Sequence, residues 1–142
     1  MSKMIFVNLP VADLPKAQAF YEAIGFTNNL QFSDETAACM VLTDEIYVML
    51  LTHAKFAQFT TREIADSQKV AAHLIALSAD DRAGVDTITD AAIAAGGREH
   101  RDPQDMGFMY GRAFEDLDGN IWEPFHMDMA AMQAMAPQTA DA

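Results

Sequence analysis

Cysteine, basic residues and long apolar stretches are all scarce in this sequence. The 142-residue chain has one cysteine, Cys39, so it can form no intrachain disulfide and offers no cysteine cluster for zinc. Nine lysines and arginines stand against 21 aspartates and glutamates, which gives a formal net charge of −12. Nucleic-acid phosphates and anionic lipids would repel so acidic a chain, so we expect neither nucleic acid nor membrane as a partner.

The apolar stretches are short and scattered. The longest, such as residues 46–51, are far too short to span a bilayer, and the first residues have the pattern of a strand without the apolar core of a signal peptide. We therefore expect a cytoplasmic protein. A hydrophobic content of 51% is enough for a core, and the length suits one compact domain or two small modules.

The first third of the chain has the pattern of one strand, one helix and three strands. Residues 4–9 predict a strand that Pro10 ends, because proline cannot donate to a ladder. Asp13 is a helix N-cap, and Gly25 closes that helix. The three further predicted strands cover residues 29–33, 37–43 and 45–52.

The same order then recurs after a polar linker or lid at residues 53–69. A strand at residues 70–78 is followed by a helix that begins near Ala83 and ends at Gly96. The remaining predicted strands cover residues 98–101, 109–115 and 120–127. The chain thus divides into a first module at about residues 4–52, a second at about 70–128 and a tail at 129–142.

The segment at residues 116–124, Asp-Leu-Asp-Gly-Asn-Ile-Trp-Glu-Pro, is the most informative motif. Asp118-Gly119 is a hairpin turn signal, and the strand that follows carries one carboxylate, Glu123, among apolar neighbours. A single glutamate in such a strand usually faces solvent or a pocket. His126 lies three residues further on, so a regular strand points it to the opposite face.

Together with the pattern Val-Ala-Asp-Leu at residues 11–14, Phe20-Tyr21 and Gly25-Phe26, this hairpin resembles the vicinal oxygen chelate superfamily. Its members include glyoxalase I, bleomycin-resistance and fosfomycin-resistance proteins, and extradiol dioxygenases. The resemblance covers roughly residues 4–128. It implies an α+β fold in which two paired βαβββ modules form a concave cavity, often in a homodimer.

The resemblance also implies four metal-ligand positions, in the first and last strands of each module. Counted from the motifs, they are Phe6, Met49, Leu74 and Glu123, with His73 in place of Leu74 if the register shifts by one residue. Phe, Met and Leu cannot replace the oxygen or imidazole ligands of a divalent ion. We therefore expect a degenerate metal site, with Glu123 and His73 as its weak candidate ligands and no firm cofactor.

Other side chains are candidates for the cavity wall. Asn8 shares a face with Phe6 and adds a polar group. Tyr110 can donate to a substrate oxygen and Arg112 can hold a carboxylate, although an ordinary strand tyrosine and a surface arginine fit the pattern equally well. Trp122 is a further candidate wall residue, and a place in the core or sheet interface is its alternative.

Three functions follow from the resemblance. The first is a binding protein of the bleomycin-resistance type, which takes a small molecule into the cavity without a metal. The alternative is a glyoxalase-like, lactoylglutathione-lyase-type lyase or isomerase with Glu123 as the base or metal ligand. A dioxygenase fits least, because iron is expected to need two histidines and a carboxylate. The partners we expect are the small-molecule ligand and a second copy of the chain.

Overall fold

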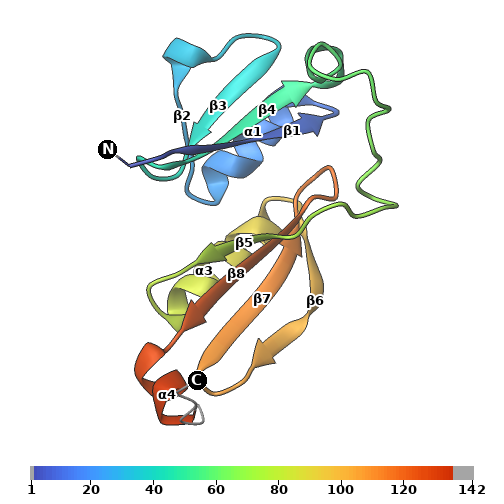
Figure 1. Cartoon of the computed structure of the whole chain (residues 1–142). Coiled ribbons are helices and arrows are strands. Elements are labelled where there is room, and N and C mark those ends of the chain that lie inside the picture. Colours follow the sequence, from blue (N-terminus) through green and yellow to red (C-terminus); the bar gives the residue numbers. More distant parts are fainter. Residues whose placement is uncertain (1, 136–142) are drawn as a thin grey trace, which may run out of the picture.

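The computed structural model describes residues 2–135 and contains two βαβββ modules (Figure 1). Each module is a four-stranded sheet with a helix on one side, so the α+β fold and the order predicted from the sequence are confirmed. The strand orders are β1-β4-β3-β2 and β5-β8-β7-β6, and in each sheet the first strand runs parallel to the last. None of the described helices is long and apolar enough to cross a membrane.

The first module begins with a strand and a well-capped helix. Its elements are β1 (Ile5–Val11), α1 (Leu14–Ala23), β2 (Thr27–Asn28), a 3-10 turn η1 (Leu30–Phe32), β3 (Ala37–Val41) and β4 (Ile46–Thr52). The Asp13 side chain accepts from Lys16 N–H at 3.1 Å, as the N-cap prediction requires. Gly25, with φ +113°, follows the end of the helix and confirms the predicted stop.

Two predictions for this module are wrong. Pro10 does not end its strand, because β1 is an edge strand and a missing N–H costs no ladder bond on the outer side. Residues 29–33 do not form a strand, because the Asn29 side chain accepts from Gln31 N–H and closes a 3-10 turn. The strand that pairs with β3 on this side, β2, consists of Thr27 and Asn28.

The second module repeats the order with a longer helix. Its elements are β5 (Ile75–Ser78), α3 (Arg82–Ala94), β6 (Arg98–Asp105), β7 (Met109–Glu115) and β8 (Ile121–Met127). The predicted strand at residues 70–78 is shorter than expected, and β6 is longer. Gly119, with φ +91°, confirms the Asp118-Gly119 turn.

The linker between the modules touches both of them. It begins as a short helix, α2 (His53–Phe56), and then runs as loop to β5. Gln68 Nε2 donates to Leu117 O at 3.1 Å, and the Ser67 carbonyl lies so close to Gly119 that a Cβ there would approach it to 2.6 Å. In the predicted tail the structure has α4 (Met129–Met135); residues 136–142 lie outside the described residues.

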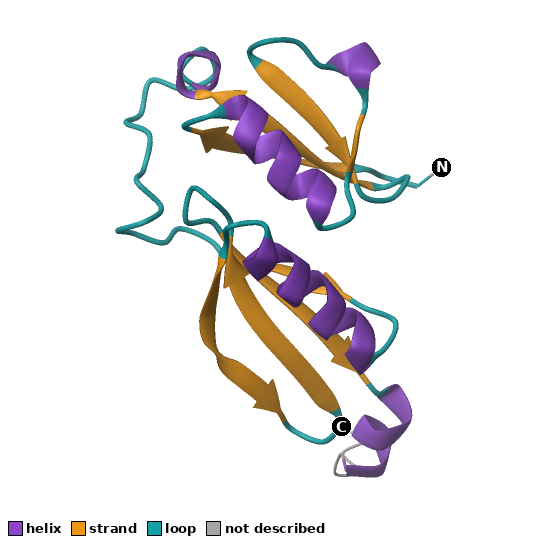
Figure 2. Ribbon diagram, turned by 180° about the vertical axis from the view of Figure 1, so that it is seen from behind, coloured by secondary structure: helices purple, strands orange, loops and turns teal. Residues whose placement is uncertain are grey.

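Both long helices cover the same side of the two sheets (Figure 2). The opposite sides carry neither long helix, and we call them the open faces. In the first module, strand register places Phe6, Asn8, Tyr47, Met49 and Cys39 on the open face. In the second, it places Glu123, Phe125 and Met127 of β8 there, together with Met109, Ala113 and Glu115 of β7.

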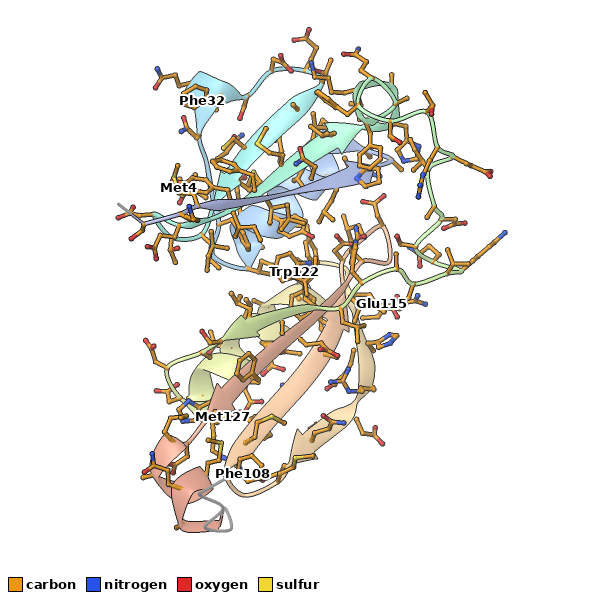
Figure 3. All side chains as sticks on the ribbon, in the orientation of Figure 1. Met4, Phe32, Phe108, Glu115, Trp122 and Met127 are labelled. Atoms are coloured by element: carbon orange, nitrogen blue, oxygen red, sulfur yellow. The ribbon has the colours of Figure 1, made fainter. Side chains whose placement is uncertain are left out.

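The two modules share one buried core on their helix side. Phe20 of α1 packs against Phe114 of β7, and Phe26 packs edge to face against Trp122 of β8. Figure 3 shows Trp122 at this junction. The junction is therefore made by aromatic side chains and not by pairing between the two sheets.

A buried hydrogen-bond chain crosses this core. Tyr21 OH donates to Asp116 Oδ2 at 2.5 Å and accepts from Trp122 Nε1 at 3.0 Å. Burial, reinforced by the Asp116 charge, raises the pKa of Tyr21 well above its ordinary value, so the hydroxyl stays a donor. Asn120 Nδ2 also donates to Asp116 at 3.0 Å, which leaves the buried carboxylate well supplied with donors.

Tyr21→Phe removes a hydroxyl that joins the two modules. Asp116 loses a charge-assisted bond and Trp122 loses its acceptor, so we expect the free energy of unfolding to fall by about 2–3 kcal/mol. Denaturant titration followed by tryptophan fluorescence measures it. Tyr47→Phe is the matched control, since the Tyr47 hydroxyl donates to Asp44 O at an exposed site. Equal effects of the two substitutions would contradict a linking role for Tyr21.

Candidate functional site

The open face of the first module is apolar and aromatic. The Phe6 and Tyr47 rings stack with centroids 4.3 Å apart, and Phe6 remains 44% exposed. Asn8 and Met49 lie side by side on adjacent strands, with Cys39 on the other side of Met49. The structure thus brings together three of the predicted wall residues, Phe6, Asn8 and Met49.

A cavity of about 410 Å³ opens at the end of this face. Its lining residues are Asn8, Leu51, Phe56, Phe59 and Thr60. Leu51 comes from β4 and Phe56 from α2, while Phe59 and Thr60 belong to the linker. The first part of the predicted lid therefore forms a wall of this cavity, and Lys55 lies 5.8 Å from the Phe59 ring centroid.

The open face of the second module has an ion pair near its centre. Arg101 Nη1 of β6 donates to Glu123 Oε2 of β8 at 2.8 Å, across β7. The side chains beside Glu123 on its two neighbouring strands are Ala76 and Ala113, so nothing large stands next to the carboxylate. Glu123 is half-buried on the face that the sequence predicted.

A second charged group lies on the same face. Glu115 Oε1 accepts from Arg98 at 2.8 Å, and Glu115 Oε2 lies 2.8 Å from His100 Nδ1. Figure 3 labels Glu115. Partial burial raises the pKa of Glu115, but hydrogen bonds from His100 and Arg98 outweigh it and hold the pKa below its ordinary value. The sequence analysis did not identify this pairing.

The third predicted ligand position, Leu74 or His73, lies outside the strands. Leu74 precedes β5 and is 57% exposed, and His73 is an exposed loop residue beside it. His126, as predicted, lies on the other side of β8 from Glu123, where its Nδ1 is 3.1 Å from Ala79 O.

Three predicted wall residues lie on the helix side, away from the open faces. Trp122 is only 2% exposed and lies in the shared core, which is the alternative that the sequence left open for it. Tyr110 OH donates to Asp86 of α3 at 2.7 Å, and Arg112 Nη1 donates to the same carboxylate at 3.0 Å. The reason is the two-residue period of a strand: Glu123 and Trp122 are neighbours, so they point to opposite faces.

Arg112 is the centre of an acidic cluster. Besides Asp86, it donates to Asp90 and, through two nitrogens, to Glu99. The Glu99 hydrogen bonds raise the pKa of Arg112 further above its already high value. The pKa of Asp86 is lowered, chiefly by the Tyr110 hydrogen bond and then by Arg112. This arginine ties α3 to β6 and β7 and has no free edge for a substrate.

The residues present do not fit a divalent metal. Phe6, Met49 and Leu74 offer no oxygen or imidazole donor, and Arg101 already occupies an oxygen of Glu123. Within residues 2–135 no group of three His, Cys, Asp or Glu side chains is placed to hold an ion. The donor set therefore departs from the metal site that the resemblance implies.

The architecture defines a class of α+β proteins in which two βαβββ modules share one chain. The sequence profile of the Glyoxalase/Bleomycin resistance protein/Dioxygenase superfamily matches residues 3–123, so the chain belongs to this superfamily. No curated protein matches the sequence.

Solved structures support the assignment of the fold. A hypothetical protein from S. aureus is 25% identical, with a TM-score of 0.74 over 89% of this chain and 94% of that one. A glyoxalase/bleomycin resistance protein/dioxygenase family enzyme from Burkholderia phytofirmans is 20% identical, with a TM-score of 0.73 over 89% and 99%. A fosfomycin resistance protein from Listeria monocytogenes is 20% identical, with a TM-score of 0.63 over 89% and 91%.

Arg112→Met tests whether this arginine is a structural residue. Its loss leaves Asp86, Asp90 and Glu99 without a shared cation, so we expect the free energy of unfolding to fall by about 1–3 kcal/mol. Arg82→Met is the control. The Arg82–Asp105 pair is exposed on both sides and screened by solvent, and the guanidinium otherwise lies over the Tyr110 ring, 4.6 Å from its centroid, so we expect a smaller loss. Denaturant titration compares the free energies of unfolding of the two variants. A larger loss from Arg82→Met would contradict this account of Arg112.

Proposed function

We propose that this protein binds an apolar small molecule at its open faces, with no metal in the site. The observation that carries the proposal is the cavity of about 410 Å³ on the first module, walled by Leu51, Phe56 and Phe59, with Asn8 and Thr60 as its polar side chains. Ligand sites are commonly concave and mostly apolar, with a few polar groups that set orientation.

Exposed aromatic side chains extend this apolar surface. Phe6 and Tyr47 form a stacked pair on the same sheet face, and Phe59 is 71% exposed at the cavity rim. Contiguous exposed apolar patches mark binding surfaces more often than single exposed apolar side chains do. The superfamily includes proteins named for antibiotic resistance, which is consistent with a binding role.

A glyoxalase-like lyase has less support from this chain. Such an enzyme would use Glu123 as a base or a metal ligand, and the half-buried carboxylate does stand on the open face. However, Oε2 of Glu123 already accepts a hydrogen bond from Arg101 at 2.8 Å. The other ligand positions of the family hold Phe6, Met49 and Leu74.

We further propose that a second copy of the chain covers the open faces. They lie on the same side of the molecule, opposite both long helices, and neither is covered by its own chain (Figures 1 and 2). Phe6 on β1 and Leu74 just before β5 are large, exposed apolar side chains. Contact between the apolar face of one copy and a face of the other would enclose the ligand and remove this surface from water.

Phe59→Ala should weaken ligand binding. N-phenyl-1-naphthylamine, a neutral aromatic probe that fluoresces in apolar sites, reports binding directly. Loss of one aromatic wall should cost about 1 kcal/mol of binding free energy, so we expect the Kd of the probe to rise about fivefold. Phe32→Ala is the matched control: Phe32 is also an exposed phenylalanine, at 63%, but it lies on the 3-10 turn η1 outside the cavity. Absence of probe binding by the unaltered protein would contradict the proposal.

Sedimentation velocity at micromolar concentration should show a dimer. Phe6→Asp places a carboxylate on the apolar open face, and burying it at the interface is unfavourable, so we expect at least a tenfold weaker dimer. Met106→Asp makes a similar change at an exposed turn beside β6 and should leave the dimer intact. A protein that sediments as a monomer throughout would contradict the second-copy proposal.

A further inference from the structure

A second cavity, also of about 410 Å³, lies where the two modules and the linker meet. The first module contributes Ala12, which follows β1, and the hairpin between β7 and β8 contributes Asp118. His53 of α2 and residues 64–68 of the linker complete its wall. The tip of this hairpin reaches the first module in Figure 1. We call this space the junction cavity, and it shares no lining residue with the cavity of the proposed function.

The walls of the junction cavity are fixed by contacts between segments that are far apart in the sequence. Ala12 N–H donates to Asp118 Oδ1 at 2.9 Å, which joins the end of β1 to the hairpin. Gln68 Nε2 donates to Leu117 O at 3.1 Å, which holds the linker against the same hairpin. The cavity is therefore formed before any ligand arrives, as ligand sites usually are.

Asp118 is a carboxylate with one oxygen to spare. Its Oδ1 accepts from Ala12 N–H, and Oδ2 accepts no hydrogen bond from the residues that the structure describes. No described side-chain oxygen is both buried and unpaired, so Oδ2 of this half-buried residue reaches accessible space. Within residues 2–135 no lysine or arginine pairs with Asp118, and none lines the cavity.

The surroundings of Asp118 favour the approach of a positive charge. Burial raises the pKa of Asp118 above its ordinary value, against the hydrogen bond from Ala12 N–H, which lowers it. The negative charges of Asp116 and Asp13 raise this pKa further, while His53 lowers it. A cation beside Oδ2 would offset both the burial and the repulsion between the carboxylates.

The remaining walls limit the kind of cation that fits. Ile64, Ala65 and Leu117 are apolar, and Asp66 adds a second carboxylate. A bare divalent ion takes six or more oxygen ligands or a tight cluster of side chains, and no described group of three His, Cys, Asp or Glu is placed to hold one. An organic cation instead needs one or two acceptors for its N–H groups and an apolar wall for its body.

We infer that the junction cavity is a second binding site, which takes a small organic cation with N–H donors, such as an amine or an amidine. The N–H groups donate to Asp118 Oδ2, and the apolar body of the ligand lies against Ile64 and Leu117. This site does not depend on the proposed function, because a different cavity carries it.

Benzamidine and benzamide test the inference, because they have nearly the same shape and only benzamidine is a cation. Titration followed by ¹H–¹⁵N NMR reports on the site through the amide of Ala12, which donates to Asp118. The amide of Ala37 is the internal control, since it donates to Asp34 outside the cavity. We expect benzamidine to shift the Ala12 signal and to bind about tenfold more tightly than benzamide, as a charge-assisted hydrogen bond predicts.

Asp118→Asn removes the charge and keeps the shape. Asparagine before Gly119 suits the turn, and its side-chain oxygen can still accept from Ala12 N–H. We expect the affinity for benzamidine to fall about tenfold and that for benzamide to change by less than about twofold. Asp80→Asn is the matched control: it makes the same change of net charge at an exposed residue outside the cavity. Its affinity for benzamidine should stay within about twofold, because solvent screens a distant charge.

The outcomes decide the inference without involving the open-face site. An Ala12 signal that benzamidine does not shift would overturn it, and so would equal affinities for the two probes, a result that needs no variant to fold. Equal losses from Asp118→Asn and Asp80→Asn would show that benzamidine senses net charge alone. An Ala12 shift produced by magnesium as readily as by benzamidine would overturn the ligand class. Binding of N-phenyl-1-naphthylamine should be the same in Asp118→Asn and the unaltered protein, so either proposal can fail alone.

Discussion

The hydrogen bond from Tyr21 to Asp116 is the constraint on which the arrangement of this protein depends. It joins the helix of one module to the final hairpin of the other, and Trp122 donates to the same hydroxyl. Buried polar groups are costly without partners, so this chain of bonds favours one relative placement of the modules. That placement directs both long helices to one side and leaves both sheet faces open on the other.

The two-residue period of the strands then decides which side chains can meet a ligand. On β8 it assigns Trp122 to the shared core and Glu123 to the open face. On β7 it assigns Arg112 and Tyr110 to α3, where three carboxylates hold the arginine. The open faces that result are apolar on the first module and charged around Arg101, Glu115 and Glu123 on the second.

Much of the fold could be predicted from local sequence, and less of the site could. Asp13, Gly25 and the Asp118-Gly119 turn act within a few residues of themselves, so their predictions are confirmed. The Asn29 turn was missed because its side chain competes with strand pairing. Arg101 was missed because its partner Glu123 lies 22 residues away on a strand that is not its direct neighbour. For Tyr110 and Arg112 the sequence left two alternatives open, a cavity wall and an ordinary strand position, because their partner Asp86 lies more than 20 residues away on α3.

The central claim is that ligand binds the open faces and not the helix side. The methionines allow a direct test, because Met49, Met109 and Met127 lie on the open faces while Met40 is buried on the helix side. The measurement is a methyl NMR spectrum of the ¹³C-methionine-labelled protein, titrated with N-phenyl-1-naphthylamine. We predict a shift at Met49, which lies beside Asn8 of the cavity, with Met40 unmoved. Shifts confined to Met40, or to methionines away from the open faces, would contradict the account.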